Sequence, residues 1–234
     1  EQTGSFVTDF YVTTSDAETE NLYHVQEYYR LRYTSDRIYL LNYERTMDQV
    51  FRENGNVYAN NKIMLGITAD EIQMEESDDG NILAFVSGNR LFSYNTVDNK
   101  MAYLFGFYDK DNKDTRTFYN MHRIKILDVS EGGNITFLVY GYMNRGRHEG
   151  EVGISAFYYD STVNTIEELV YIPSEEPQDV IIEKVNRLSY INRDGILYLM
   201  DNQHIYGINF TERTYEMVAD HLHYNGYVIS DSNR

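Results

Sequence analysis

The stretch "VSEGGNITFLVYGYMNRGRHEGEVGISAFYYD", residues 129–160, contains the pattern that recurs along this chain. A polar turn with glycine comes first, and two segments of alternating apolar and aromatic residues follow, which is the pattern of β-strands. Between these segments lies a charged insert, Met143 to Gly150, with further glycines around it. The stretch therefore predicts two strands joined by a long polar connection.

Two shorter patterns from this stretch repeat elsewhere in the chain. The first is a polar turn followed by a strand, as in "ESDDGNILAFV", "INRDGILYLM" and, close to residue 234, "VISDSNR". The second is a predicted hairpin, as in "LFSYNTVDNKMAYLF", "SAFYYDSTVNTIEELVYI" and "IYGINFTERTYEMVA", with an earlier copy in "IYLLNYERTMDQVF" from Ile38. Glycine reaches a positive φ angle at low cost, which suits a turn. The glycines of the first pattern are Gly80, Gly133 and Gly195.

The spacing of the repeat predicts the fold class. Equivalent positions at Tyr43, Tyr94, Tyr159 and Ile208 lie about 49 to 65 residues apart, close to the roughly 40 to 50 residues of a propeller blade plus its loops. We therefore expect an all-β, β-propeller-like array of four-stranded antiparallel blades in one domain, residues 1–234. The last repeat stops at its first turn, so the sequence predicts a partial or truncated propeller. The predicted blades are 22–60, 61–118, 119–177 and 178–221, and 222–234 is the predicted start of a further blade.

Composition limits the class of partner. The chain has 234 residues, with 37 acidic and 20 basic side chains and a formal charge of −17, which repels the phosphates of nucleic acids. It has no cysteine, which excludes disulfides, thiolate metal sites and cysteine nucleophiles. No apolar run approaches the roughly 20 residues of a membrane helix. We expect neither a nucleic-acid partner nor direct membrane insertion by this fragment.

Residues 22–234 resemble the propeller-like domains of uncharacterised membrane-anchored extracytoplasmic proteins of Gram-positive bacteria. The resemblance rests on the "DG" and "GGN" turns, the "YD" and "YN" hairpins and the segment "YGYMNRGRHEGEVGI". It implies a non-catalytic extracytoplasmic domain and supplies no catalytic residues. On this interpretation the chain is an ectodomain freed from an amino-terminal signal or anchor, although a cytosolic fragment would have the same sequence.

The charged insert is the candidate binding site. It makes the connection about ten residues longer than in the preceding repeat, and insertions of this kind often carry recognition. Its side chains suit a carboxylate, a phosphate or a sugar hydroxyl. The alternatives are an extended hairpin with solvated charges, or a contact with an adjacent blade or domain. The predicted binding residues are Tyr142, Asn144, Arg145, Arg147, His148 and Glu149.

Other chemical patterns are weaker. Asp109, Asp111 and Asp114 lack the spacing of an EF-hand. His221 and His223 share a predicted strand face but have no third ligand. Adjacent acids such as Glu167–Glu168 follow from composition, and we interpret them as solvated turn residues. The sequence therefore predicts no catalytic residue, no metal site and no cofactor.

The predicted function is a non-catalytic extracytoplasmic binding, sensory or scaffold domain that recognises a protein or a small ligand. The alternative is a carbohydrate-active hydrolase with paired carboxylates in a propeller channel. A third interpretation is a cytosolic scaffold. Buried, convergent carboxylates with raised pKa values would favour the enzyme.

Overall fold

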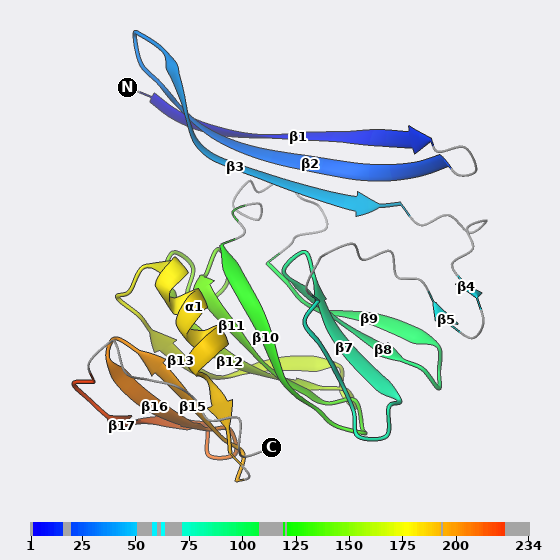
Figure 1. Ribbon diagram of the computed structural model, residues 1–234, viewed down its shortest axis with the longest axis vertical. Helices are drawn as coiled ribbons and strands as arrows, with labels where there is room; N and C mark the ends of the chain where they lie inside the picture. The colour runs from blue at the N-terminus through cyan, green and yellow to red at the C-terminus, as the bar shows by residue number, and fades with distance from the viewer. Residues whose placement is uncertain are drawn as a thin grey trace. The chain divides into compact units, whose positions relative to one another are not determined.

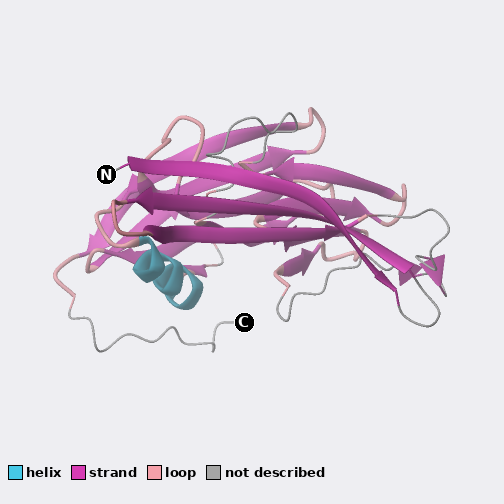
Figure 2. Cartoon of the chain, turned by 90° about the horizontal axis from the view of Figure 1, so that it is seen from above, coloured by secondary structure: helices cyan, strands magenta, loops and turns pink. Residues whose placement is uncertain are grey.

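The described part of the chain is mostly β-structure, and the chain divides into two compact units (Figure 1). One unit contains residues 1–71 and 108–120, and the other contains residues 72–107 and 121–234. The described residues contain one helix, α1 (Gln178–Leu188), among the strands (Figure 2). The computed structural model describes residues 2–15, 20–50, 58–59, 62–63, 72–107, 119, 121–192 and 194–222.

The first unit is built on a three-stranded antiparallel sheet. Its strands are β1 (Gln2–Ser15), β2 (Glu20–Tyr33) and β3 (Ile38–Gln49), with β2 in the centre. Two further strands, β4 (Tyr58–Ala59) and β5 (Lys62–Ile63), form a short separate pair. The four-stranded blade predicted over residues 22–60 is therefore wrong, because β1 lies outside that range and completes a sheet of three strands.

The predicted hairpin in "IYLLNYERTMDQVF" is also wrong, because β3 is one continuous strand. Side-chain contacts across the sheet keep it extended. Phe6 of β1 stacks on Tyr29 of β2 with ring centroids 4.9 Å apart, and Tyr29 lies 5.0 Å from Tyr43 of β3. Such cross-strand aromatic rows stabilise a sheet, and a turn after Tyr43 would break this one.

Next to the aromatic row, the Glu27 carboxylate ties β3 to β2. The Tyr29 hydroxyl donates to one carboxylate oxygen at 2.6 Å, and the Tyr43 hydroxyl donates to the other at 2.9 Å. The Arg45 guanidinium donates to that second oxygen through both Nε and Nη2. The bonds from Tyr29, Arg45 and Tyr43, in that order, lower the pKa of Glu27 to about 2. Glu27 is therefore ionised in the folded sheet, where its carboxylate accepts hydrogen bonds from both strands.

Among its described residues, the second unit contains three four-stranded antiparallel sheets, each with its strands in chain order. The predicted ranges 61–118, 119–177 and 178–221 each contain one of them, so the all-β, antiparallel prediction is confirmed. The first sheet comprises β6 (Met74–Glu76), β7 (Ile82–Ser87), β8 (Arg90–Asn95) and β9 (Lys100–Phe105). The second comprises β10 (His122–Val129), β11 (Ile135–Tyr142), β12 (Val152–Asp160) and β13 (Thr165–Pro173). The third comprises β14 (Tyr190–Ile191), β15 (Ile196–Asp201), β16 (His204–Asn209) and β17 (Thr214–Ala219).

The recurring glycine turns have the predicted conformation. Gly80, Gly133 and Gly195 have φ angles of 69°, 85° and 75°. Each glycine amide donates to the carbonyl three residues earlier, at 2.8, 2.9 and 3.1 Å respectively. The same turn therefore leads into the second strand of each sheet. The predicted fourth copy from Val228 lies outside the described residues.

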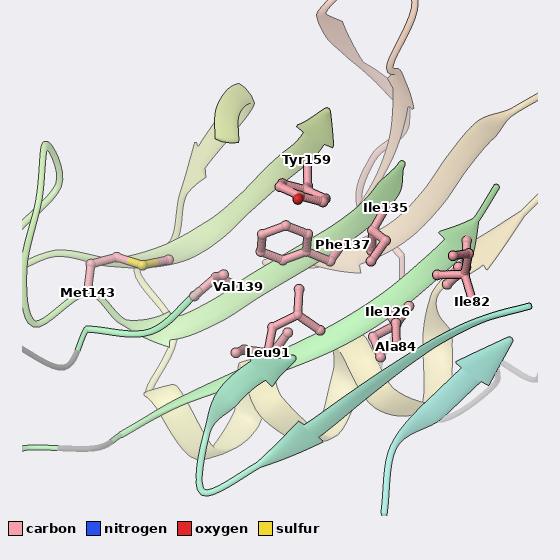
Figure 3. Close-up of a cluster of buried hydrophobic side chains, with 11 residues drawn as sticks. Ile82, Ala84, Leu91, Ile126, Ile135, Phe137, Val139, Met143 and Tyr159 are labelled. Atoms are coloured by element: carbon pink, nitrogen blue, oxygen red, sulfur yellow. The ribbon is translucent and has the colours of Figure 1, made fainter. Parts of the chain in front are cut away.

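The first and second sheets share one hydrophobic core, shown in Figure 3. Phe105 of β9 lies 5.5 Å from Phe137 of β11 and 5.1 Å from Phe157 of β12, measured between ring centroids. Apolar burial of this kind supplies most of the driving force for packing one sheet on another. The buried members of this core are Ile82, Ala84, Leu91, Ile124, Ile126, Val129, Ile135, Phe137, Val139, Met143 and Tyr159.

The opposite face of the second sheet packs against α1 (Gln178–Leu188) and the third sheet. Ile181 and Val185 of α1 enter this second core, one helical turn apart. The Tyr140 hydroxyl of β11 donates to Asn186 Oδ1 at 2.5 Å. The Lys125 ammonium of β10 donates to Ser189 Oγ at 2.6 Å, next to the carboxyl end of the helix, where a cation is favourable. These contacts hold a helix that the repeat pattern did not predict.

A buried histidine links the first and second sheets. His122 of β10 is 1% exposed, and its Nε2 lies 3.2 Å from the Asn89 carbonyl oxygen in the turn between β7 and β8. Its ring meets Phe107 edge-on at 4.7 Å. Burial lowers the pKa of His122 from 6.5 to about 4. The folded unit therefore holds this imidazole neutral.

We predict that His122 makes folding sensitive to mild acid. His122 takes up a proton near pH 6.5 in the unfolded chain and only near pH 4 in the folded chain. The contribution of neutral His122 to the free energy of unfolding is therefore complete above pH 6.5, and it is lost as the pH falls toward 4. The loss reaches on the order of 3 kcal/mol. Urea unfolding of the wild type and His122→Gln at pH 7.5 and at pH 4.5 should show a smaller decrease for the variant. Equal decreases in the two proteins would show that buried His122 is not the cause of the acid sensitivity.

Candidate functional site

The candidate site is the connection between β11 and β12. β11 ends at Tyr142 and β12 begins at Val152, whereas two residues, Gly88 and Asn89, join the corresponding strands β7 and β8. The long insert predicted from sequence is therefore present. It belongs to the second sheet, the one that is covered on both faces.

The insert is closed at its base. The Met143 amide donates to the Glu151 carbonyl oxygen at 2.9 Å, and the Gly150 amide donates to the Met143 carbonyl oxygen at 2.8 Å. The Met143 side chain is 3% exposed and belongs to the first core. Gly146 and Gly150, with φ angles of 91° and 90°, supply the bends. Backbone hydrogen bonds and one buried side chain thus fix both ends of the loop.

His148 points inward and clamps the loop to β13. Its Nε2 lies 2.9 Å from Glu168 Oε1. Its ring stacks on Tyr171, with centroids 3.5 Å apart and planes inclined by 10°. The other ring nitrogen lies 3.7 Å from a carboxylate oxygen of Glu151. The imidazole is thus held between two carboxylates, on top of an aromatic ring.

Gly153 of β12 makes room for this stack. A Cβ at this position would lie 2.8 Å from the Tyr171 ring and 2.6 Å from the Ile172 carbonyl oxygen, which is closer than packed atoms tolerate. Tyr171 therefore lies directly over the glycine, and His148 lies over Tyr171. Burial first, and then the carboxylates of Glu151 and Glu168, raise the pKa of the Tyr171 hydroxyl, so that it stays protonated at physiological pH.

Glu168 connects the clamp to the interior of the sheet. The Ser155 hydroxyl, on a residue that is 1% exposed, donates to Glu168 Oε2 at 2.8 Å. A serine nucleophile needs its hydroxyl to donate to the imidazole that removes its proton. Here the hydroxyl donates to the carboxylate, which lies between it and His148. The three side chains therefore form a hydrogen-bonded chain from β12 through β13 to the loop.

The structure divides the predicted binding residues into two groups. Asn144 is buried at 2% exposure and His148 is held in the clamp, so these two face inward. The side chains of Arg147 and Glu149 are exposed, and those of Tyr142 and Arg145 are half-buried. A role of the six residues in binding stays a prediction. The surface available to a ligand is centred on Arg147 and Glu149.

Sequence reasoning missed Glu168, Tyr171 and Gly153. The interpretation of Glu168 as a solvated turn residue is wrong, because it lies within β13 and contacts His148. A bulge in β13 at Leu169, opposite Ala156 and Phe157, shifts the register directly after Glu168 and so places Glu168 and Tyr171 on the same face of the sheet, and spacing alone does not reveal such a shift. The unusual glycine in the strand beside the charged insert was the available signal.

A second polar cluster lies near the amino-terminal end of α1. Ser174 Oγ donates to Asp201 Oδ1 at 2.7 Å, and the Lys184 ammonium pairs with Glu176. Asp201 is 1% exposed. Burial, and then the nearby Glu176 charge, raise its pKa, while the bond from Ser174 opposes the increase. Both carboxylates therefore have a partner within the fold.

The acidic residues and the histidine pair noted in the sequence lie wholly or partly outside the described residues. Within the described residues, no three His, Asp or Glu side chains form a group able to hold a metal ion. Asp109, Asp111 and Asp114, and also His223, lie outside the described residues. Across the described ranges, no helix has the length and apolar character needed to cross a membrane.

Comparisons with known proteins identify no family. No protein-family model matches the chain, and no curated protein matches it. Among solved structures, it is similar at 12% identity and a TM-score of 0.36 to a candidate 6-phosphogluconolactonase from Bacteroides uniformis, over 90% of this chain and 54% of that one. It is similar at 10% identity and a TM-score of 0.34 to dipeptidyl peptidase 4 from Porphyromonas gingivalis, over 91% of this chain and 30% of that one. The extracellular domain of a candidate one-component system from B. thetaiotaomicron matches at 11% identity and a TM-score of 0.26, over 88% of this chain and 27% of that one.

The chain thus spans about half, or less, of the length of these structures. Similarity at this level does not transfer a function.

We predict that the clamp stabilises the second unit and that its exposed neighbour does not. His148→Ala removes the stack on Tyr171 and leaves half-buried Glu168 without its imidazole partner, which should cost about 1 to 2 kcal/mol. Arg147→Ala, one residue away and exposed, should change the free energy of unfolding by less than about 0.5 kcal/mol. Urea unfolding of both variants measures the difference. Equal effects would contradict an inward-facing His148.

Proposed function

We propose that this chain is a non-catalytic, extracytoplasmic binding, sensory or scaffold domain of β-propeller-like construction that recognises a protein or a small ligand. The observation that carries the proposal is the rigid loop between β11 and β12. Two backbone hydrogen bonds close its base, the Met143 side chain anchors it and His148 clamps it. A loop held in this way loses little conformational entropy when it binds.

The proposed propeller-like arrangement is supported by the stacking of the sheets. Three successive four-stranded sheets use the same strand order and the same leading turn. The middle sheet shares one core with the sheet before it and another with α1 and the sheet after it. Successive blades of a propeller cover one another in the same manner.

The chemistry of the loop suits a ligand group that carries a carboxylate or a phosphate. Arg147 is exposed on the loop, with half-buried Arg145 nearby in sequence, and guanidinium groups bind such anions through paired hydrogen bonds. The total charge of −17 opposes a large anionic partner at long range. The location outside the cytoplasm rests on the sequence resemblance.

The alternative, a carbohydrate-active hydrolase, requires two carboxylates that face a shared substrate space. Among the described residues, Glu151 and Glu168 have the His148 imidazole between them. A second close pair is Asp201 with Glu176. Ser174 bonds to one of these acids and Lys184 pairs with the other, next to the packed face of α1. That arrangement favours a structural role for this second pair.

The proposal is tested by titration calorimetry with three probes: inorganic phosphate, glucuronic acid and a tetraglutamate peptide. We expect the wild type to bind at least one probe, and Arg147→Ala to weaken that binding roughly tenfold or more, since a charge-assisted bond is lost. Arg187→Ala removes an exposed arginine from α1 and is the matched control, expected to bind as the wild type does. Failure of all three probes to bind, or an equal loss in both variants, would contradict recognition by this loop.

A further inference from the structure

The outer edge of β1 differs from every other sheet edge in the described residues. β1 pairs with β2 over fourteen consecutive residue pairs, from Gln2 with Tyr33 to Ser15 with Glu20, without a register shift. On its other side, no strand in the described part of the chain pairs with it. Most of its side chains are exposed, and Asp9 is its one charged residue. A long, regular and nearly neutral edge is a template for a further strand.

The other edges are protected in the usual ways. The edge strands β6 and β14 have three and two residues, and the paired strands β4 and β5 have two each. The longer edge strands β3, β9, β10, β13 and β17 each contain a bulge. Bulges and short strands prevent edge-to-edge pairing. Among the described sheet edges, β1 is therefore the one that is neither short nor interrupted by a bulge.

The sequence of β1 is partly symmetric about Thr8. In "QTGSFVTDFYVTTS", two of the six pairs of residues at equal distances from Thr8 are identical, Phe6 with Phe10 and Thr3 with Thr13. An antiparallel pair of two β1 strands, with its two-fold axis at Thr8, places Phe6 of each copy opposite Phe10 of the other. Phe6 and Phe10 are 45% and 38% exposed. The pairing continues the aromatic row of Phe6, Tyr29 and Tyr43 into the second copy.

We infer that β1 is a dimerisation edge, and that its partner is β1 of a second copy of this chain. The interface is isologous, as two-fold symmetry requires, and it joins two three-stranded sheets into one of six strands. This inference does not rest on the proposed ligand-binding function, since the residues concerned lie in a different unit.

The negative charge of each chain makes this dimer depend on the salt concentration. In the register centred on Thr8, Asp9 lies opposite Val7 of the second copy, so the two aspartates are not directly opposed. The Asp9 carboxylate already has partners, with Gln26 Nε2 donating at 2.7 Å and His24 Nε2 at 2.8 Å. Each chain still carries a charge of −17, and salt screens the repulsion between copies. Association should therefore strengthen as salt increases.

Cysteine crosslinking tests both the dimer and its register, because the chain has no cysteine of its own. Thr3→Cys and Thr13→Cys change two exposed positions. In the inferred pairing Thr3 of one copy is opposite Thr13 of the other, whereas the two Thr3 residues are roughly 33 Å apart. A mixture of the two variants should be crosslinked by a short bis-maleimide, and each variant alone should not. Crosslinking that is no stronger in the mixture than in either variant alone would overturn the inference.

Sedimentation equilibrium at low and high NaCl provides the second test. The wild type should show more dimer at high salt. Phe10→Lys should remove the dimer, and Met47→Lys, at the opposite end of the same cross-strand row, should leave it intact. A monomer at every salt concentration, or an equal loss in both variants, would also overturn the inference.

Discussion

The structure of the second unit depends on one constraint, the burial of β11 on both faces. Phe137, Leu138 and Val139 are consecutive residues without exposed surface, and the side chains of a strand point alternately to opposite faces. Phe137 and Val139 enter the core shared with the first sheet, and Leu138 enters the core shared with α1 and the third sheet. A sheet with two apolar faces must be covered twice, so the stack of three sheets follows from this strand.

The same constraint accounts for the candidate site. The loop between β11 and β12 begins where this buried strand ends, and Met143 continues into the first core. The Gly153, Tyr171 and His148 stack then fixes the rest of the loop against β13. The first unit is organised differently. Both hydrophobic clusters found among the described residues belong to the second unit, and a hydrogen-bonded network around the Glu27 carboxylate joins the strands of the first.

Local features of the sequence predicted much of this fold. The glycine turns at residues 80, 133 and 195, and the hairpins that follow them, depend on backbone preferences of a few neighbouring residues. The strand β3 was predicted as a hairpin because its extended form depends on Glu27 and Tyr29, which lie in another strand. Helix α1 was missed although Pro177 precedes it and Asp179 lies in its first turn, because the four-stranded blade predicted over residues 178–221 includes no helix. The charged insert was found, but the inward direction of His148 depends on a bulge in β13 that spacing does not show.

Two adjacent substitutions in β11 test most directly whether both faces of the middle sheet are buried. Phe137→Ala and Leu138→Ala remove side chains from opposite faces of the same sheet, and each should lower the free energy of unfolding by about 2 to 5 kcal/mol in urea titrations. Large losses are expected from both substitutions, because a core covers each face. If either substitution lowered it by less than about 0.5 kcal/mol, one face of the middle sheet would be open to solvent, which would contradict the stacked arrangement.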